Sequence, residues 1–365
     1  MLSWQHLRSN VKIYFIQGDY NFCYYYRGYL PGIYSNNYVV EDFLQGATSL
    51  SGEEMKEKAM KCDVICFQRP SGKEVLKLAK ILKKAGKYII FDNDDTYSGV
   101  PLHRLENEKQ VQVAKEINAR LNEFCAFADG VTTTTQVLAD EYRKINPNVA
   151  ILKNCIDPID EFTCKKNITG KFRVGFIGSV TSNDDYFHIK EQIRQLDARG
   201  DITIVILGVK NQKGKLMAST MKEDYDFWVT LKNIEWHNAV NVTEYMHTIS
   251  QLALDLAIIP RKDHYFNKCK SNLKFLEMSL LYIPVLAQSF PDGLSPYEPD
   301  KEYCTLVSDD STWYSTIINI KDNYAHYKNL ANKAHDYVLK EYNITTYAQE
   351  WVKQIEKLCK YQQNS

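Results

Sequence analysis

Hydrophobic runs alternate with amphipathic stretches along most of the chain. In the first half, five short runs rich in β-branched and aromatic residues predict strands at residues 11–17, 63–68, 87–92, 130–134 and 149–153. Between them, stretches such as 73–85 and 106–127 carry apolar residues at spacings of three and four. That spacing is typical of helices with one buried face.

The same alternation restarts after a polar stretch at residues 165–170. It predicts strands at 172–177, 202–207, 234–237, 254–260 and 283–288, helices at 184–199, 243–252 and 272–282, and a closing helical run at 311–360. Strands that alternate with helices form parallel sheets covered on both faces. We therefore predict an α/β fold with two Rossmann-like, doubly wound domains in tandem, at residues 1–156 and 157–344, facing a cleft. A chain of 365 residues has the length for two such cores.

Composition narrows the function classes. Lys plus Arg and Asp plus Glu each number 45, so the net charge is zero, which argues against a dedicated nucleic-acid binder. The nine cysteines are scattered without a CxxC pair, and the eight histidines form no HExxH motif. This spacing favours neither a disulfide framework nor a zinc site, and it suggests buried thiols in a reducing compartment. No secretory-type leader or membrane-spanning run is recognisable, so we expect a cytoplasmic protein.

The strongest constellation of candidate residues follows the strand that ends at Pro260. We expect a polar loop there and a helix from about Ser271, with Ser271 as its N-cap and its free N–H groups forming an anion site. Lys270, Lys274 and Glu277 then share one helical face, at spacings of four and three. The lysines suit a diphosphate, and the carboxylate suits ribose hydroxyls. A solvated Lys–Glu face is the alternative.

This segment resembles the donor-nucleotide region of retaining glycosyltransferases of the GT-B fold, of the group-one or family-four type. Glu277 matches the second glutamate of the family's E-x7-E motif, and residues 283–287, IPVLA, match the strand that follows. Cys269 stands at the first glutamate, but the pattern F-N-x-x-K-S-x-x-K-x-L-E of a subgroup is present. Residues 149–157 resemble the linker between the two domains.

The resemblance implies a metal-independent enzyme without a cofactor, which transfers a sugar with retention from a nucleotide-diphosphate donor to a hydroxyl acceptor. The acceptor would belong to a bacterial-type surface glycan, or be lipid-linked or a protein. Gly178 and Ser179 correspond to the loop where donor phosphates approach, and Asn267 replaces the missing glutamate near the transferred sugar. Residues 345–365 resemble the last helix of this fold, which crosses back to the first domain.

An acidic cluster, Asp92-Asn93-Asp94-Asp95, directly follows the strand at 87–92. The resemblance to the GT-B family implies that Asp94 and Asp95 lie near the place of a His-Asp pair of that family, so one of them is the candidate catalytic carboxylate. Adjacent like charges are expected to raise one pKa, which suits proton handling. Two alternatives stay open: a turn cap without chemistry, and a metal site of the GT-A type held by Asp92 and Asp94.

Three further features of the first domain are candidates for acceptor or surface contacts. Gly18 and Asp19 follow the first strand, where a loop near the ligand or a simple turn fits equally. Seven tyrosines between Tyr20 and Tyr38 could stack on sugars or form core. A lysine stripe at residues 73, 77, 80 and 84 predicts either a solvated face or contact with the inner face of a membrane. A non-catalytic nucleotide-sugar-binding scaffold remains a further alternative.

Overall fold

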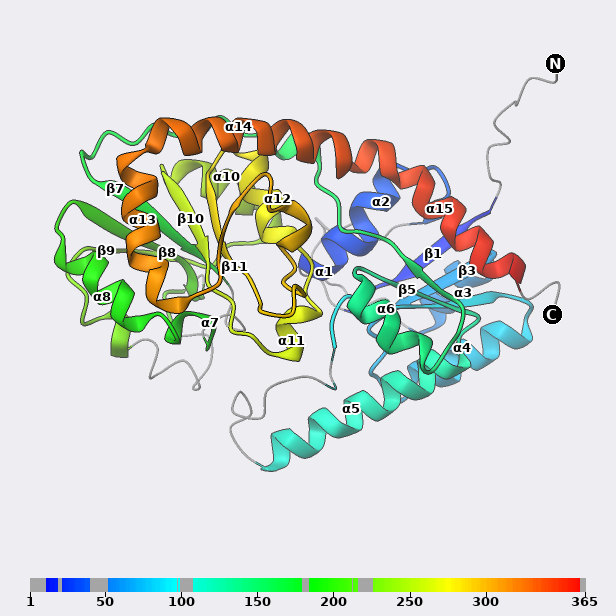
Figure 1. Ribbon diagram of the computed structural model, residues 1–365. Helices are drawn as coiled ribbons and strands as arrows, with labels where there is room; N and C mark the ends of the chain where they lie inside the picture. Colours follow the sequence, from blue (N-terminus) through cyan, green and yellow to red (C-terminus); the bar gives the residue numbers. More distant parts are fainter. Residues whose placement is uncertain are drawn as a thin grey trace, which may run out of the picture. The chain divides into compact units, whose positions relative to one another are not determined.

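The computed structural model describes residues 11–18, 22–39, 52–96, 98, 108–178, 184–211, 213–215 and 226–361. They divide into two compact units (Figure 1). Unit 1 holds the described residues of Met1–Leu102, Asn107–Cys155 and Ile344–Ser365, and unit 2 holds Ile156–Asn343. Each unit is built on one parallel sheet, as the alternation of strands and helices predicts.

The sheet of unit 1 has six strands in the order β2-β1-β3-β4-β5-β6. The strands are β1 (Ile13–Ile16), β2 (Tyr38–Val39), β3 (Val64–Gln68), β4 (Tyr88–Asp92), β5 (Gly130–Thr133) and β6 (Val149–Ile151). The helices are α1 (Phe22–Tyr24), a π-helical turn at Tyr25–Tyr29, α2 (Leu30–Ile33), α3 (Gly52–Met60), α4 (Val75–Lys84), α5 (Glu108–Phe127), α6 (Gln136–Arg143) and α15 (Ile344–Tyr361). All five predicted strands are present, and β2 adds a short edge.

Helix α15 is part of the core of unit 1, although it comes last in the sequence. Its side chains Trp351, Val352 and Ile355 pack with buried residues of β1, β3 and β4. Asn148, before β6, also donates from Nδ2 to the backbone oxygen of Leu358 over 2.8 Å. The last helix therefore belongs to the first unit, as the family resemblance implies.

The sheet of unit 2 has the order β12-β11-β10-β7-β8-β9. Its strands are β7 (Phe172–Ile177), β8 (Ile202–Lys210), β9 (Ile234–Asn238), β10 (Leu256–Ile259), β11 (Val285–Gln288) and β12 (Thr305–Val307). Its helices are α7 (Asp184–Phe187), α8 (Lys190–Ala198), α10 (Val242–Gln251), α11 (Tyr265–Lys268), α12 (Leu273–Leu280), α13 (Trp313–Asp322) and α14 (Tyr324–Glu341). The helical run predicted at 311–360 is thus three helices, the last of them in unit 1.

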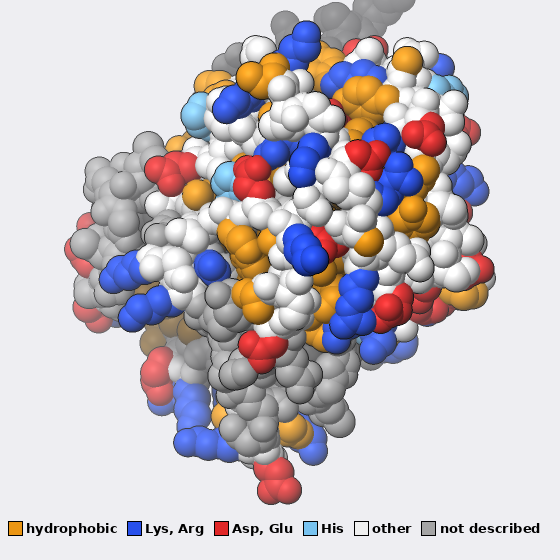
Figure 2. Space-filling view, turned by 90° about the vertical axis from the view of Figure 1, so that its left-hand side faces the viewer, with side chains coloured by type: hydrophobic (Ala, Val, Ile, Leu, Met, Phe, Trp, Pro, Cys, Tyr) orange, Lys and Arg blue, Asp and Glu red, His pale blue; other side chains and the backbone are white. Residues whose placement is uncertain are grey.

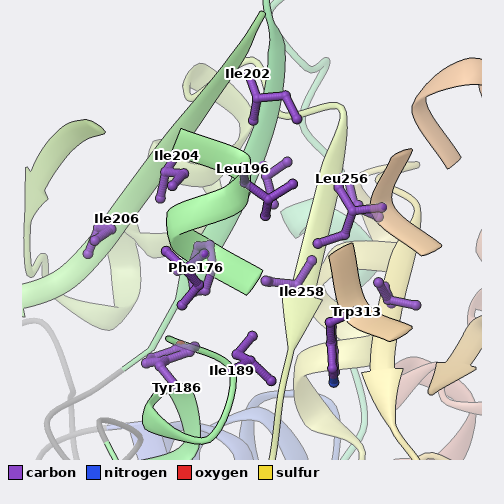
Figure 3. Packing of buried hydrophobic residues seen from close by; sticks show 14 of the residues in the cluster. Phe176, Tyr186, Ile189, Leu196, Ile202, Ile204, Ile206, Leu256, Ile258 and Trp313 are labelled. Atoms are coloured by element: carbon purple, nitrogen blue, oxygen red, sulfur yellow. The ribbon is translucent and has the colours of Figure 1, made fainter. Parts of the chain in front are cut away.

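The core of unit 2 lies between its sheet and the helices on one face. Figure 3 shows Ile204, Ile206 and Ile258 of the strands in one cluster with Leu196 and Trp313 of the helices. Every residue of β7 is buried, which is typical of a central strand covered on both faces. The rigid strands of this core hold the loops that follow them in fixed positions.

The surface view in Figure 2 shows Lys and Arg side chains interspersed with Asp and Glu side chains. Among the described residues of that face, charges of one sign form no continuous patch. This mixture agrees with the zero net charge of the chain.

Candidate functional site

A small pocket opens at the carboxyl ends of β7 and β10 in unit 2. The residues that line it are Ile177, Asp185, Tyr186, Ile259, Pro260, Arg261 and Lys274. Ligands of open α/β sheets bind at such strand ends. Arg261 and Lys274 bring two cations to this pocket, and Asp185 brings one carboxylate.

Arg261 is held in the pocket by three side chains. Its Nε donates to the hydroxyl oxygen of Tyr297 over 3.1 Å, and its Nη1 lies 3.3 Å from Asn267 Oδ1 and 3.4 Å from Asp185 Oδ2. Burial disfavours the charged guanidinium, but Tyr297 and Asp185 outweigh it and raise the pKa of Arg261 above its ordinary value. Arg261 therefore stays cationic and fixed in place.

Asp185 and Asn267 fix the loop that carries Arg261. Asp185 Oδ1 accepts hydrogen bonds from Asn267 Nδ2 over 2.6 Å and from the backbone N–H of Lys262 over 3.1 Å. Asn267 also donates to the backbone oxygen of Lys262 over 2.9 Å, and its side chain is fully buried. The contact of Asn267 with a transferred sugar stays a prediction, and its observed role is to order this loop.

Lys274 and Glu277 share one face of α12, as their spacing predicts. Lys274 Nζ lies 3.1 Å from Glu277 Oε2, and the Glu277 side chain is only 1% exposed. Tyr245 of α10 donates from its hydroxyl to the same Glu277 oxygen over 3.3 Å. The pair is therefore a buried arrangement with a third partner, and the solvated Lys–Glu face is wrong for Glu277.

The start of α12 differs from the prediction. The helix begins at Leu273, and Asn272 rather than Ser271 is its N-cap residue, without a capping hydrogen bond from its side chain. The Asn272 amide instead donates to Asp300 Oδ2 over 2.8 Å and to the Tyr342 hydroxyl over 3.1 Å. The buried Asp300 carboxylate needs these donors, so it takes the side chain away from the helix end.

Two predicted donor residues flank this region. Lys270 precedes α12, so it does not share the helical face of Lys274, and its ammonium lies 4.0 Å from the centre of the Phe266 ring. Gly178 directly follows β7, at the strand end where the pocket opens. Ser179 lies outside the described residues.

In unit 1, the first residue of the acidic cluster has a structural role. Asp92 ends β4 and is fully buried, and its Oδ2 lies 2.7 Å from Arg27 Nη2 while its Oδ1 accepts from Arg27 Nε over 3.3 Å. Thr132 adds a hydrogen bond to Oδ2 over 2.7 Å. With both oxygens bonded and a second parallel sheet in the chain, the GT-A alternative with Asp92 as a metal ligand is wrong.

Asp94 and Asp95 lie beyond the strand end and face Arg69. Asp94 Oδ1 accepts from Arg69 Nε over 2.8 Å, and Asp95 Oδ2 lies 3.8 Å from Arg69 Nη2. Burial favours the neutral form of Asp94, but the guanidinium groups of Arg69 and Arg27 outweigh it and lower its pKa. The pKa of Asp94 is therefore lowered by the arginines, whereas burial raises the pKa of Asp92, to which the negative charge of Asp94 also contributes.

Gly18 brings the ends of β1 and β3 into contact. A Cβ atom at this position would lie 2.4 Å from the backbone oxygen of Gln68, so only glycine fits. The Gly18 N–H donates to Gln68 Oε1 over 3.1 Å. Arg69, the next residue, has a φ of 45°, a conformation that non-glycine residues rarely adopt. Asp19 and Tyr20 lie outside the described residues.

The tyrosine-rich segment packs inside unit 1. Tyr24, Tyr25, Tyr26 and Tyr38 are all less than 9% exposed. The buried Arg27 lies in the same segment, and its guanidinium is 4.5 Å from the centre of the Trp351 ring. These four rings therefore form core rather than a sugar-stacking surface, whereas Tyr29 and Tyr34 are half-buried.

The cysteines are free thiols, and seven of the nine are buried. Burial raises the pKa of Cys125 to about 12 and that of Cys155 to about 12, so both stay protonated and unreactive. Within the described ranges, no group of three or more His, Cys, Asp or Glu side chains has the arrangement of a metal site. None of the described helices combines the length and hydropathy needed to cross a bilayer.

Four residues with central roles were not predicted: Arg27, Arg69, Asp185 and Arg261. The sequence does indicate Arg69 and Arg261 as candidates, because each follows a predicted strand within one or two residues, where ligands of such sheets bind. Asp185 is part of no recognisable sequence motif, and Arg27 lies in a segment without clear periodicity. The residues that they contact are distant in sequence and can be identified only from the folded structure.

No family model matches the sequence, and no curated protein is detectably similar to it. Solved structures are similar in fold. Anabaena Alr3699/HepE in complex with UDP-glucose has a TM-score of 0.65 at 12% identity, covering 95% of this chain and 100% of that chain. Sucrose-phosphate synthase from Thermosynechococcus elongatus has a TM-score of 0.60 at 12% identity, covering 85% and 77%. TarM has a TM-score of 0.58 at 12% identity. The match covers 80% of this chain but only 54% of TarM.

These similarities, with the two parallel six-stranded sheets, identify the fold as the GT-B type. The predicted fold class is thus confirmed. At this level of identity the similarity concerns the fold alone.

Proposed function

We propose that the protein is a glycosyltransferase that transfers a sugar from a nucleotide-diphosphate donor to a hydroxyl acceptor. The observation that carries the proposal is the pocket of unit 2, which Arg261 and Lys274 line, together with the contact of Lys274 with the buried Glu277. Two cations in a pocket suit a diphosphate, and a desolvated carboxylate beside one of them suits the ribose hydroxyls. A structure of similar fold holds UDP-glucose, which supports the same class of donor.

The chemistry of the pocket is electrostatic. When the bond between sugar and diphosphate breaks, negative charge grows on the leaving phosphate oxygens. Fixed cations stabilise that charge without reorganisation, and this is commonly the largest contribution to such catalysis. Arg261 is held for this role by Asp185 and Tyr297, and Lys274 by α12. We propose that these side chains carry the leaving-group charge without a metal ion or other cofactor, with retention at the sugar carbon.

The acceptor is proposed to bind at the carboxyl ends of β1, β3 and β4 in unit 1. Gly18, Arg69 and Asp94 meet there. The lowered pKa of Asp94 keeps it ionised at neutral pH, so it accepts a hydrogen bond from the acceptor hydroxyl and orients it. Asp95 is the second candidate for this contact. The acceptor class we favour is a bacterial-type surface glycan, free, lipid-linked or on a protein.

We also propose a cytoplasmic location with surface contact to the inner face of a membrane. The support is α4, where Lys77, Lys80 and Lys84 are exposed and Ile81 is 51% exposed among them. Lysines attract anionic lipid, and an exposed isoleucine adds apolar contact. Co-sedimentation with vesicles containing phosphatidylglycerol, compared with neutral vesicles, tests this contact. Equal binding to both would contradict it.

The experiment for the main proposal is a donor screen. The purified chain is incubated with UDP-, GDP- and ADP-linked hexoses and a glycan-rich acceptor extract, and release of the nucleoside diphosphate is followed. We expect acceptor-dependent release from one donor, undiminished by excess EDTA. Binding of a nucleotide sugar without release from any donor would instead favour the non-catalytic scaffold.

A further inference from the structure

Tyr245 joins the two residues that we assign to the nucleotide. Tyr245 lies on helix α10 (Val242–Gln251), and its side chain is buried against α12. Its hydroxyl lies 3.3 Å from Glu277 Oε2, and it also accepts a hydrogen bond from Lys274 Nζ. The Lys274 ammonium stands 4.6 Å from the centre of the Tyr245 ring. No sequence motif connects Tyr245 to α12, so only the fold reveals this contact.

The direction of these hydrogen bonds is fixed by charge. Burial, and next the negative charge of Glu277, raise the pKa of Tyr245 well above its ordinary value, so the hydroxyl keeps its proton. A lysine ammonium can only donate, and an ionised carboxylate can only accept. The Tyr245 hydroxyl therefore accepts from Lys274 and donates to Glu277. It bridges the two groups, and the hydrogen bond that it donates orients the Glu277 carboxylate.

A bound diphosphate would change the partners of Lys274. Lys274 lines the pocket, whereas the Glu277 oxygen that it contacts is buried. An anion in the pocket competes with Glu277 for the Lys274 ammonium. Tyr245 also donates to this oxygen, and it does not line the pocket. It therefore keeps its contact with Glu277 when Lys274 moves toward the ligand.

We propose that Tyr245 is a positioning residue, which holds the Glu277 carboxylate in the orientation that accepts the ribose hydroxyls of the donor nucleotide. This inference rests on the proposed function, and it adds the residue on which ribose recognition depends. A buried carboxylate that loses one fixed donor adopts other rotamers more readily, and it then binds the two hydroxyls less well.

The test compares ribose with dideoxyribose in matched variants. UDP and 2′,3′-dideoxy-UDP are titrated by calorimetry into wild-type protein, Tyr245→Phe and the control Tyr324→Phe, which removes the hydroxyl of a tyrosine at the start of α14. If another nucleoside diphosphate binds the wild type better, its own ribose and dideoxyribose forms are used. Thermal unfolding of each variant is recorded in parallel.

We expect wild type and Tyr324→Phe to prefer the ribose form by at least about tenfold, the usual value of a hydrogen bond to a charged group. In Tyr245→Phe this preference falls below about threefold, while affinity for the dideoxy form is unchanged. In a Glu277→Gln background, Tyr245→Phe causes no further loss, because it acts through Glu277.

Two results would overturn the inference while leaving the proposed function intact. In the first, Tyr245→Phe keeps the wild-type preference for ribose. In the second, it loses affinity for both forms equally, as a general structural defect would cause. A wild-type protein that binds no nucleoside diphosphate would instead overturn the proposed function itself.

Discussion

Arg27 and Asp92 form a buried ion pair at the centre of unit 1, with Arg27 Nη2 2.7 Å from Asp92 Oδ2 and both side chains at most 1% exposed. Arg27 comes from the π-helical turn after β1, and Asp92 ends β4. Arg27 also donates to the backbone oxygen of Leu152 and contacts the ring of Trp351 on α15. One guanidinium therefore connects the sheet, the end of β6 and the last helix.

Replacing Arg27 by Met should destabilise the protein strongly. The change leaves the Asp92 carboxylate buried without its cation, which typically costs about 3–5 kcal/mol. Urea unfolding should show this loss, and Lys84→Met, at an exposed position on α4, should leave the unfolding midpoint unchanged. The double variant Arg27→Met/Asp92→Asn should lose less than the sum of the single changes. Additive losses would show that the two groups are not coupled.

The Asp94–Arg69 ion pair should make the free energy of unfolding depend on pH in the acid range. The pKa of Asp94 is lowered in the folded protein, so the unfolded chain takes up the proton first as the pH falls. The contribution of the pair is therefore complete above about pH 3.9, the ordinary aspartate pKa, and is lost as the pH falls through the lower folded value. Urea unfolding of wild type and Asp94→Asn should differ by a constant amount from pH 7 to about pH 4, and the difference should shrink below that. A difference that persists unchanged in acid would contradict the pairing.

Gly18→Ala should disturb the proposed acceptor side. The added Cβ would meet the backbone oxygen of Gln68 at 2.4 Å, so β1 or β3 must shift, at a cost of about 1–3 kcal/mol. Because Arg69 follows Gln68, turnover should also fall. Gly72→Ala is the matched control, since its Cβ would meet only the side chain of Val75, at 3.0 Å. Equal unfolding midpoints and rates for the two variants would exclude a special role of Gly18.

Arg261→Lys should weaken binding of the nucleoside diphosphate although the charge is kept. A lysine cannot reproduce the planar set of donors that meets Tyr297, Asn267 and Asp185, so its ammonium would not be held toward the pocket. We expect affinity to fall by about tenfold or more in calorimetry. Lys262→Ala removes the exposed neighbouring cation and should have little effect. A similar loss in both variants would point to general electrostatic attraction instead.

The periodicity of the sequence predicts ten of the twelve strands of the two sheets. Strands such as β3 and β10 are runs dominated by apolar residues, so their hydrophobic pattern is clear. The strands β2 and β12 were not predicted, since two or three residues carry no periodicity. The segment from α1 to α2 was also missed as helix, because its consecutive tyrosines are buried on all sides and leave no polar face.

The candidate site was predicted only where its residues lie close together in sequence. Lys274 and Glu277 are three apart on one helix, so their pairing followed from helical geometry. The partners of Arg261 come from α7, α11 and a loop near residue 297, and Tyr245 comes from α10. Such contacts depend on strand order and helix packing, which local patterns do not contain. The contact of the N-cap residue Asn272 with Asp300 is of the same kind, since Asp300 is distant in sequence.

The most direct test of the central claim is calorimetric titration of the wild-type protein and Glu277→Gln with nucleotide sugars. The substitution keeps the shape of the side chain and removes the charge that we assign to the ribose. The account predicts that the wild type binds one nucleotide sugar, and that Glu277→Gln, with an unchanged unfolding transition, binds it at least about tenfold more weakly. Equal affinity in the two folded proteins, or no binding by the wild type, would contradict the account.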